Sequence, residues 1–151
     1  MISTMTTDTS DRRLGHIVAD HRALRRESSE LLVLAEHGRE LDHALRSTLV
    51  ERLGRLCERL RLHFALEEDG GYMTEVLVRR PGLQVHVMRL QQEHAVILTE
   101  GAALARLLLS MPPPRDARSR VVRLLEALRD HELAEHDLLH EALVVDLGGG
   151  D

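Results

Sequence analysis

Residues 45–69 read LRSTLVERLGRLCERLRLHFALEED, and this stretch decides the fold that the sequence predicts. Leucine returns every three or four positions, which is the spacing of one face of an α-helix. The stripe comprises Leu45, Leu49, Leu53, Leu56 and Leu60, and it continues into His63 and Glu67. A histidine and a glutamate therefore occupy positions where an amphipathic helix would normally carry core leucines.

Three further stretches show the same helical spacing. They run from Leu14 to Ala35, from Leu83 to Leu108, and from Val121 to Val145. Turn signals separate the four stretches, at Gly38 and Asp42, at Gly70-Gly71 and RPG (80–82), and at prolines 112–114. A short helical piece is expected between Gly71 and about Arg79. With no strand pattern, the sequence predicts an all-α fold, an up-down-up-down four-helix bundle.

The composition supports one aliphatic helical domain. The chain has 151 residues, 43% of them apolar, with one Phe, one Tyr and no Trp. We expect the bundle to span residues 11–147, between disordered tails at 1–10 and 148–151. Cys57 is the sole cysteine, which excludes an intramolecular disulfide and favours a structural role.

Charge and hydropathy narrow the class of protein. The net charge of −5 is spread along the chain without a basic stripe, which argues against nucleic-acid binding. The N-terminus lacks the apolar run of a signal peptide, and no stretch reaches the roughly 20 apolar residues of a membrane span. A cytoplasmic protein is expected. All 20 basic residues are arginine, which we associate with a GC-rich bacterial genome.

Each of the four apolar stripes contains one histidine, and two stripes add a glutamate one turn later. The residues are His21, His63, Glu67, His94, His131 and Glu135. His94 lies 18 residues before Pro112 and His131 lies 17 after Pro114, so antiparallel helices place both at one level. For His21 and His63 the numbers of residues to the nearest turns differ more. A turn of several residues at 37–42 and the Gly70-Gly71 break can compensate for that difference in length. The sequence predicts that the six side chains converge.

The other histidines do not fit this level or this face. They are His16, His37, His43, His86, His136 and His140, and we expect them near turns, at a bundle end or on the surface. The letters HELAEH at 131–136 resemble a zinc-protease motif, but Glu135 stands where His-Glu-x-x-His needs a histidine. That interpretation is rejected.

A converging set of imidazoles and carboxylates indicates metal binding. One inward histidine alone is more often a hydrogen-bonded core residue, but two buried carboxylates without partners would be costly. The donors suit iron, manganese or zinc, and six ligands exceed the needs of one tetrahedral zinc. We expect two metal ions, each held by two histidines, with Glu67 and Glu135 as bridges. Because ligation needs neutral imidazole, metal affinity should fall below about pH 6.5.

The order of these residues resembles the hemerythrin-like (HHE cation-binding) domain family over about residues 14–146. The segments HFALEEDGGYM (63–73) and QEHAVIL (92–98) are also similar to that family. The resemblance implies a bundle around a non-haem centre of two iron ions with an oxo or hydroxo bridge. It also implies that His21, His63, Glu67, His94, His131 and Glu135 are the ligands.

The resemblance to oxygen-carrying hemerythrins is incomplete. Those proteins have a fifth histidine in a His-x-x-x-His pair on the third helix, where this chain has Leu90 and Leu98 on either side of His94. One carboxylate also follows its histidine by four positions rather than five. Simple reversible oxygen carriage is therefore not favoured, and the ligand is expected to be O2, hydrogen peroxide or nitric oxide.

Several alternatives stay open at this level. The protein is either a peroxide- or nitric-oxide-consuming di-iron enzyme, a non-enzymatic oxygen, redox or iron sensor, or a structural bundle with incidental metal. An enzyme would need an external electron donor, because no dinucleotide fingerprint is present. Tyr72 either packs the break at Gly70-Gly71 or approaches the iron as a neighbour or an extra ligand.

Overall fold

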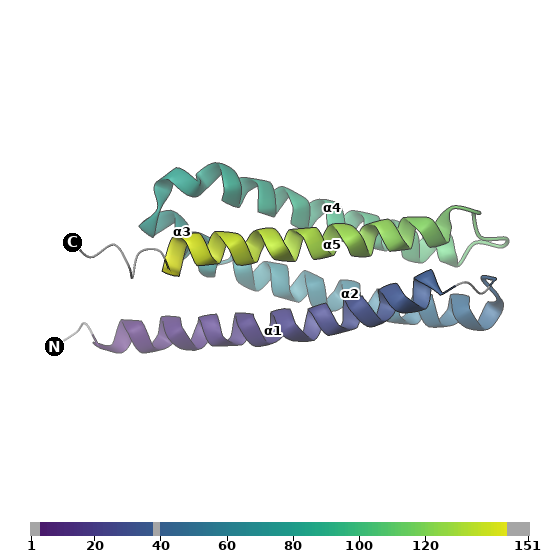
Figure 1. Ribbon diagram of the computed structural model, residues 1–151, viewed down its shortest axis with the longest axis horizontal. Helices are drawn as coiled ribbons and strands as arrows, with labels where there is room; N and C mark the ends of the chain where they lie inside the picture. Colours follow the sequence, from purple (N-terminus) through teal and green to yellow (C-terminus); the bar gives the residue numbers. More distant parts are fainter. Residues whose placement is uncertain (1–3, 38–39, 145–151) are drawn as a thin grey trace.

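A computed structural model of the chain describes residues 4–37 and 40–144. Four long helices dominate it, and their bounds are α1 (Thr4–Glu36), α2 (His43–Glu68), α4 (Gln84–Leu108) and α5 (Ala117–Leu139). The short helix α3 (Tyr72–Arg79) lies at the same end as the start of α1 and the end of α5 (Figure 1). The predicted four-helix bundle is confirmed, and the described residues include no strand.

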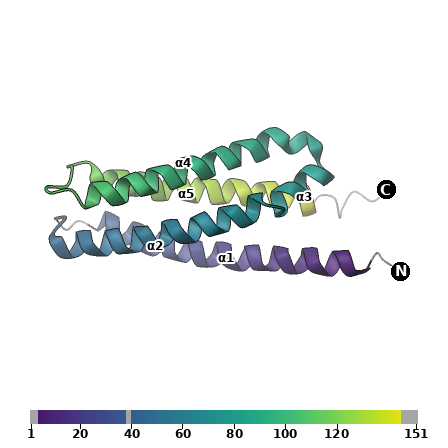
Figure 2. The same cartoon turned by 180° about the vertical axis from the view of Figure 1, so that it is seen from behind.

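Each long helix packs against two others. The neighbouring pairs are α1 with α2, α2 with α4, α4 with α5, and α5 with α1. Figure 2 shows α2 and α4 side by side at the front, with α1 and α5 behind them. Four antiparallel helices arranged in this order enclose one elongated interior.

The helix ends follow the turn signals. Asp42 caps α2 by accepting a hydrogen bond from the Leu45 backbone N–H at 2.8 Å. Helix α2 ends at Glu68, and Gly70 then adopts a φ of 71°, a conformation that favours glycine. At Gly71 a Cβ atom would collide with the carbonyl oxygens of Leu66 and Glu67. The glycine pair thus lets the chain fold back against the end of α2 and begin α3 at Tyr72.

Two boundaries differ from the expected ones. Residues 4–10, expected in a tail, belong to α1, because no proline interrupts the stretch and each added residue extends the hydrogen-bond ladder. After Leu139 the regular α-helix ends and the chain continues as a π-helix, η2 (His140–Val144). The other short element is the 3₁₀ turn η1 (Pro81–Leu83), which connects α3 to α4. Residues 1–3 and 145–151, including the expected C-terminal tail, lie outside the described part, as do the side chains of Leu14 and Val18.

The buried apolar residues form two clusters along the bundle. The larger contains residues such as Leu24, Leu60, Ile97 and Leu128. The smaller surrounds α3 and contains residues such as Ile17, Tyr72, Leu90 and Leu138. Because His21, His94 and His131 each lie between members of the two clusters in sequence, a polar layer separates the clusters inside the bundle.

Two further features bear on earlier expectations. Cys57 is a half-buried free cysteine of α2, and a Cβ atom at Gly101 of α4 would meet its Sγ atom, which fits a packing role. Within residues 4–37 and 40–144, none of the helices carries an apolar stretch of the length needed to cross a bilayer.

Candidate metal centre

The polar layer contains all six residues that the sequence singled out. Helix α1 contributes His21, α2 contributes His63 and Glu67, α4 contributes His94, and α5 contributes His131 and Glu135. The two glutamates are at most 1% exposed, and only His21 is partly exposed, at 13% of its side chain. The i, i+4 spacing on α2 and on α5 places each glutamate one turn from its histidine on the same inward face.

Glu135 lies at the centre of the layer and faces three histidines. Its Oε1 atom is 2.6 Å from His131 Nε2 and 3.0 Å from His94 Nε2. Its Oε2 atom is 3.0 Å from His21 Nε2. The two oxygens of one carboxylate therefore point toward different histidines, as a carboxylate that bridges two cations would.

Glu67 approaches the same layer from α2. Its Oε1 atom is 3.1 Å from His63 Nε2 and 3.8 Å from His94 Nε2, while Oε2 is 3.6 Å from His21 Nε2. Glu67 thus lies mainly against His21 and His63. Two groups of donors result, one of His21, His63, Glu67 and Glu135, the other of His94, His131 and Glu135, each with ligand atoms within 4.8 Å of one another.

Several of these atoms lack hydrogen bonds although they are buried. His21 Nε2, His63 Nε2 and both oxygens of Glu67 face one another at short range but without hydrogen-bond geometry. Buried polar atoms normally have hydrogen-bond partners, and leaving one without a partner costs about 1–3 kcal/mol. A cation between them would satisfy all of these atoms together. The donor set therefore fits a metal ion on the evidence of its own unpaired atoms.

Partly exposed carboxylates face three of the histidines from outside the layer, and two of them lie at hydrogen-bond distance. His131 Nδ1 is 2.7 Å from Glu93 Oε2, and His94 Nδ1 is 2.9 Å from Glu68 Oε1. His63 Nδ1 is farther from its carboxylate, 3.7 Å from Asp20 Oδ2. A carboxylate that accepts a hydrogen bond from Nδ1–H keeps the proton on that nitrogen and leaves the Nε2 lone pair free for a metal. The sequence interpretation missed these three residues.

The metal-free layer binds protons in place of cations. Burial lowers the pKa of His21, but the adjacent carboxylates of Glu135 and Glu67 raise it by more, to about 10 from 6.5. His131 behaves similarly: burial opposes its charge, and Glu135 and Glu93 still raise its pKa. Burial raises the pKa of Glu135, but His131, His21 and His94 hold it well below the ordinary value. The layer therefore stabilises positive charge.

Two aromatic residues border the layer. The Phe64 ring stacks on His94 with centroids 3.8 Å apart and planes 6° apart, and it meets His131 edge-on at 5.5 Å. Tyr72 is 2% exposed, and its hydroxyl has no hydrogen bond of normal geometry with the described residues. Burial and the nearby carboxylates of Glu135 and Glu67 raise the pKa of Tyr72 well above its usual value. The phenol therefore keeps its proton next to the layer.

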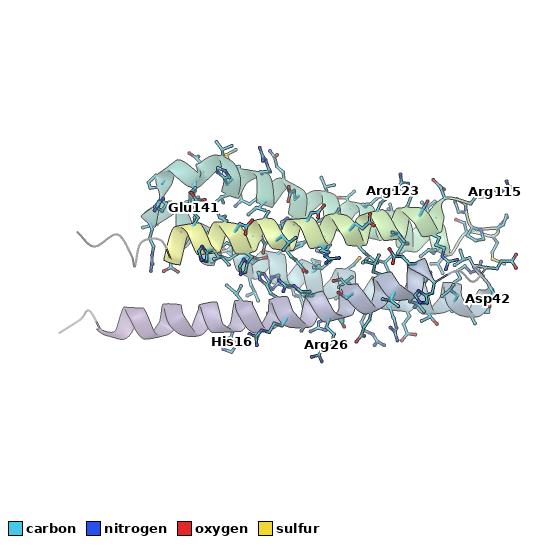
Figure 3. The ribbon with its side chains drawn as sticks, in the orientation of Figure 1. His16, Arg26, Asp42, Arg115, Arg123 and Glu141 are labelled. Carbon is cyan, nitrogen blue, oxygen red and sulfur yellow. The ribbon has the colours of Figure 1, made fainter. Side chains whose placement is uncertain are left out.

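The remaining histidines lie away from the layer. All six are exposed: His16, His37, His43, His86, His136 and His140. Figure 3 shows His16 on the outer side of α1, pointing away from the bundle. Their expected surface positions are confirmed.

Fold and site together define a four-helix-bundle metal-binding protein with a buried layer of histidine and glutamate donors. The chain matches the hemerythrin HHE cation binding domain over residues 13–143 and belongs to that family. The comparisons with curated proteins and with solved structures give no match. Cation binding is thus the activity that family and site share.

Proposed function

We propose that the protein holds two iron ions in the polar layer and uses them to bind or react with O2, hydrogen peroxide or nitric oxide. The unpaired Nε2 and carboxylate atoms of His21, His63 and Glu67 carry this proposal, because a buried set of this kind is costly without cations. Imidazole and carboxylate donors without thiolate suit iron. When bound, an iron pair would supply open coordination positions and electrons for a small ligand.

The residues of the chain have separate roles in this proposal. His94 and His131 offer Nε2 atoms to one ion, and His21 and His63 offer theirs to the other. Glu135 would hold both ions, and Glu67, which lies mainly against His21 and His63, would be the second carboxylate that holds them. Glu93 and Glu68 keep protons on the Nδ1 atoms of His131 and His94, so these two histidines stay in the tautomer that can bind a cation at Nε2.

A groove between α4 and α5 reaches His131 of the layer, and we propose it as the approach for small molecules. It has a volume of about 460 Å³ and is lined by residues that include Ile97, Ala127, Glu93 and His131. Arg89 and Glu93 also line an adjoining groove of about 230 Å³. A diatomic molecule or a peroxide fits this space, and an external electron donor is proposed to act from outside the bundle.

Replacing Tyr72 with Phe tests its role. We propose that the protonated hydroxyl donates a hydrogen bond to the small ligand rather than binding iron. Tyr72→Phe should keep its iron and its visible spectrum, while peroxide consumption slows by about tenfold or more. Iron content, absorption spectra and initial rates measure these effects. Loss of a visible charge-transfer band in the variant would instead identify a tyrosinate ligand.

Iron analysis of protein made in iron-replete cells tests the proposed function itself. We expect about two irons per chain and the absorption bands of an oxo- or hydroxo-bridged ferric pair. Assays of hydrogen peroxide and nitric oxide consumption, with and without a reductant, then separate an enzyme from a module that only binds. Substoichiometric iron after anaerobic reconstitution with Fe²⁺ would reject the di-iron proposal.

A further inference from the structure

We infer that the two metal positions differ in affinity, and that the one at His94 and His131 fills first and more tightly. This inference rests on the proposed function, because it assumes that the layer takes two cations. We call the position of His94 and His131 the α4–α5 position, and that of His21 and His63 the α1–α2 position. Each position has two inner histidines and shares Glu135, and the α1–α2 position also has Glu67. The difference inferred here comes from the residues that support the histidines from behind.

The outer carboxylates form an incomplete ring around the bundle. Each lies next to an inner donor in sequence and supports the histidine of the following helix. Asp20 of α1 faces His63 of α2, Glu68 of α2 faces His94 of α4, and Glu93 of α4 faces His131 of α5. Figure 1 shows α1 beside α5, where a fourth link from α5 to His21 would close the ring.

That fourth link is missing among the side chains that the structure describes. On α5 the acidic residue that stands next to an inner donor and also lies against α1 is Glu132, which follows His131. Its Oε2 atom lies 3.7 Å from Arg25 Nε on α1, and its buried Oε1 atom has no hydrogen bond. No ion pair joins Glu132 to His21, so His21 receives no outer carboxylate from this helix.

The strength of support therefore differs between the two positions. Both histidines of the α4–α5 position have short contacts to outer carboxylates, 2.7 and 2.9 Å. In the α1–α2 position, His63 has a contact of 3.7 Å, beyond hydrogen-bond length, and His21 has none. A carboxylate that accepts the Nδ1–H bond makes the imidazole a stronger donor at Nε2 and fixes its orientation. Only the α4–α5 position has this support on both histidines.

Ring packing adds to the difference. Phe64 stacks on His94 and meets His131 edge-on, so both rings are fixed before a cation arrives. His63 lies farther from Phe64, with centroids 6.2 Å apart, and the side chain of His21 is 13% exposed. The rings of His21 and His63 meet edge-on at 4.7 Å, as those of His94 and His131 do at 4.8 Å, so the contacts with Phe64 are what distinguish the α4–α5 position. A donor pair that is held more firmly loses less conformational freedom on binding.

Titration of the metal-free full chain with Co²⁺ under anaerobic conditions tests the order of filling. The visible spectrum and competition with a chelator give the dissociation constants. The wild type should bind two equivalents, the first at least about tenfold more tightly than the second. His63→Ala should keep the tight equivalent and lose the weak one, whereas His131→Ala should lose the tight one.

Variants of the outer carboxylates give a test that leaves all six inner ligands in place. Glu93→Gln and Glu68→Gln should each weaken the first equivalent by about 10-fold to 100-fold. Asp20→Asn should change the dissociation constant of the first Co²⁺ equivalent by less than about threefold, because Asp20 contacts a histidine of the α1–α2 position. Glu126→Gln, an exposed change on the same helix as His131, removes one charge and serves as the matched control.

The outcomes separate this inference from the proposed function. If His63→Ala and His131→Ala bound their one remaining Co²⁺ ion with equal affinity, the order of filling would be overturned. Binding of two ions by the wild type would still support the proposed function. Unchanged first equivalents in Glu93→Gln and Glu68→Gln would do the same, even if the histidine variants fail to fold. A wild-type chain that binds neither Co²⁺ nor Fe²⁺ would reject the proposed function instead.

Discussion

Glu135→Gln should strongly weaken the binding of both metal ions, although it changes one atom in an isosteric side chain. Glu135 contacts His131, His94 and His21 with Nε2 distances of 2.6, 3.0 and 3.0 Å, so it serves both groups of donors. Gln cannot supply two anionic oxygens, and we expect each affinity to fall by about 100-fold or more. Metal analysis after dialysis and Co²⁺ titration measure the loss.

The metal-free variant should also be less stable. Hydrogen bonds to charged groups contribute about 1.5–3 kcal/mol, so unfolding of metal-free Glu135→Gln should cost on the order of 2 kcal/mol less than the wild type. Urea unfolding followed by circular dichroism gives this value.

Glu132→Gln is the matched control, since Glu132 is another buried glutamate of α5 and its ion pair is with Arg25, not with one of the histidines. If Glu135→Gln retained two ions, or if Glu132→Gln lost them equally, Glu135 would not be the shared ligand.

The sequence predicted the bundle and the inner donors for the same reason. Periodicity of 3.6 residues shows which positions face the interior, and a histidine such as His94 between Leu90 and Ile97 stands out against that pattern. The depth of each histidine followed from the turns, because prolines and glycines fix where antiparallel helices end. Gly70-Gly71 was predicted as a break, and the structure explains why α3 begins at Tyr72.

The outer carboxylates could not be predicted in the same way. Asp20, Glu68 and Glu93 lie at half-exposed positions, where acidic residues are common on any soluble helix. Their role depends on contacts between helices, Glu93 with His131 for example, and one sequence does not reveal helix rotation. A signal was nevertheless present: an acidic residue stands beside an inner donor on all four helices, as in Asp20-His21 and Glu93-His94. Glu132 follows the same pattern but forms no ion pair with His21. The pattern therefore identifies candidate outer carboxylates, and only the structure shows which of them contact a histidine.

Metal removal should reverse the pH dependence of stability above pH 6.5. In the metal-free protein the pKa of His21 is about 10, above its ordinary 6.5, so the folded state holds a proton that the unfolded chain releases. The stabilisation from that proton is complete below pH 6.5 and disappears as pH rises toward 10. The free energy of unfolding should fall over this window on the order of 5 kcal/mol, since one pKa unit corresponds to about 1.4 kcal/mol. The raised pKa of His131 acts in the same direction.

The metal-loaded protein should behave oppositely. A cation needs the neutral Nε2 atoms of His21 and its partners, so metal and proton compete for the same atoms, and higher pH favours the metal. The sequence alone placed this competition below about pH 6.5, whereas the pKa of His21 extends it to about 10. Urea unfolding at pH 6.5, 8 and 9.5, with Zn²⁺ as a redox-inactive metal and with a chelator, measures both curves. If the free energy of unfolding changed with pH in the same way with Zn²⁺ and with the chelator, the cation would not displace the His21 proton, and His21 would not be a ligand. If the two curves diverged in the wild type but not in His21→Gln, the exchange of proton for metal would take place at the His21 imidazole.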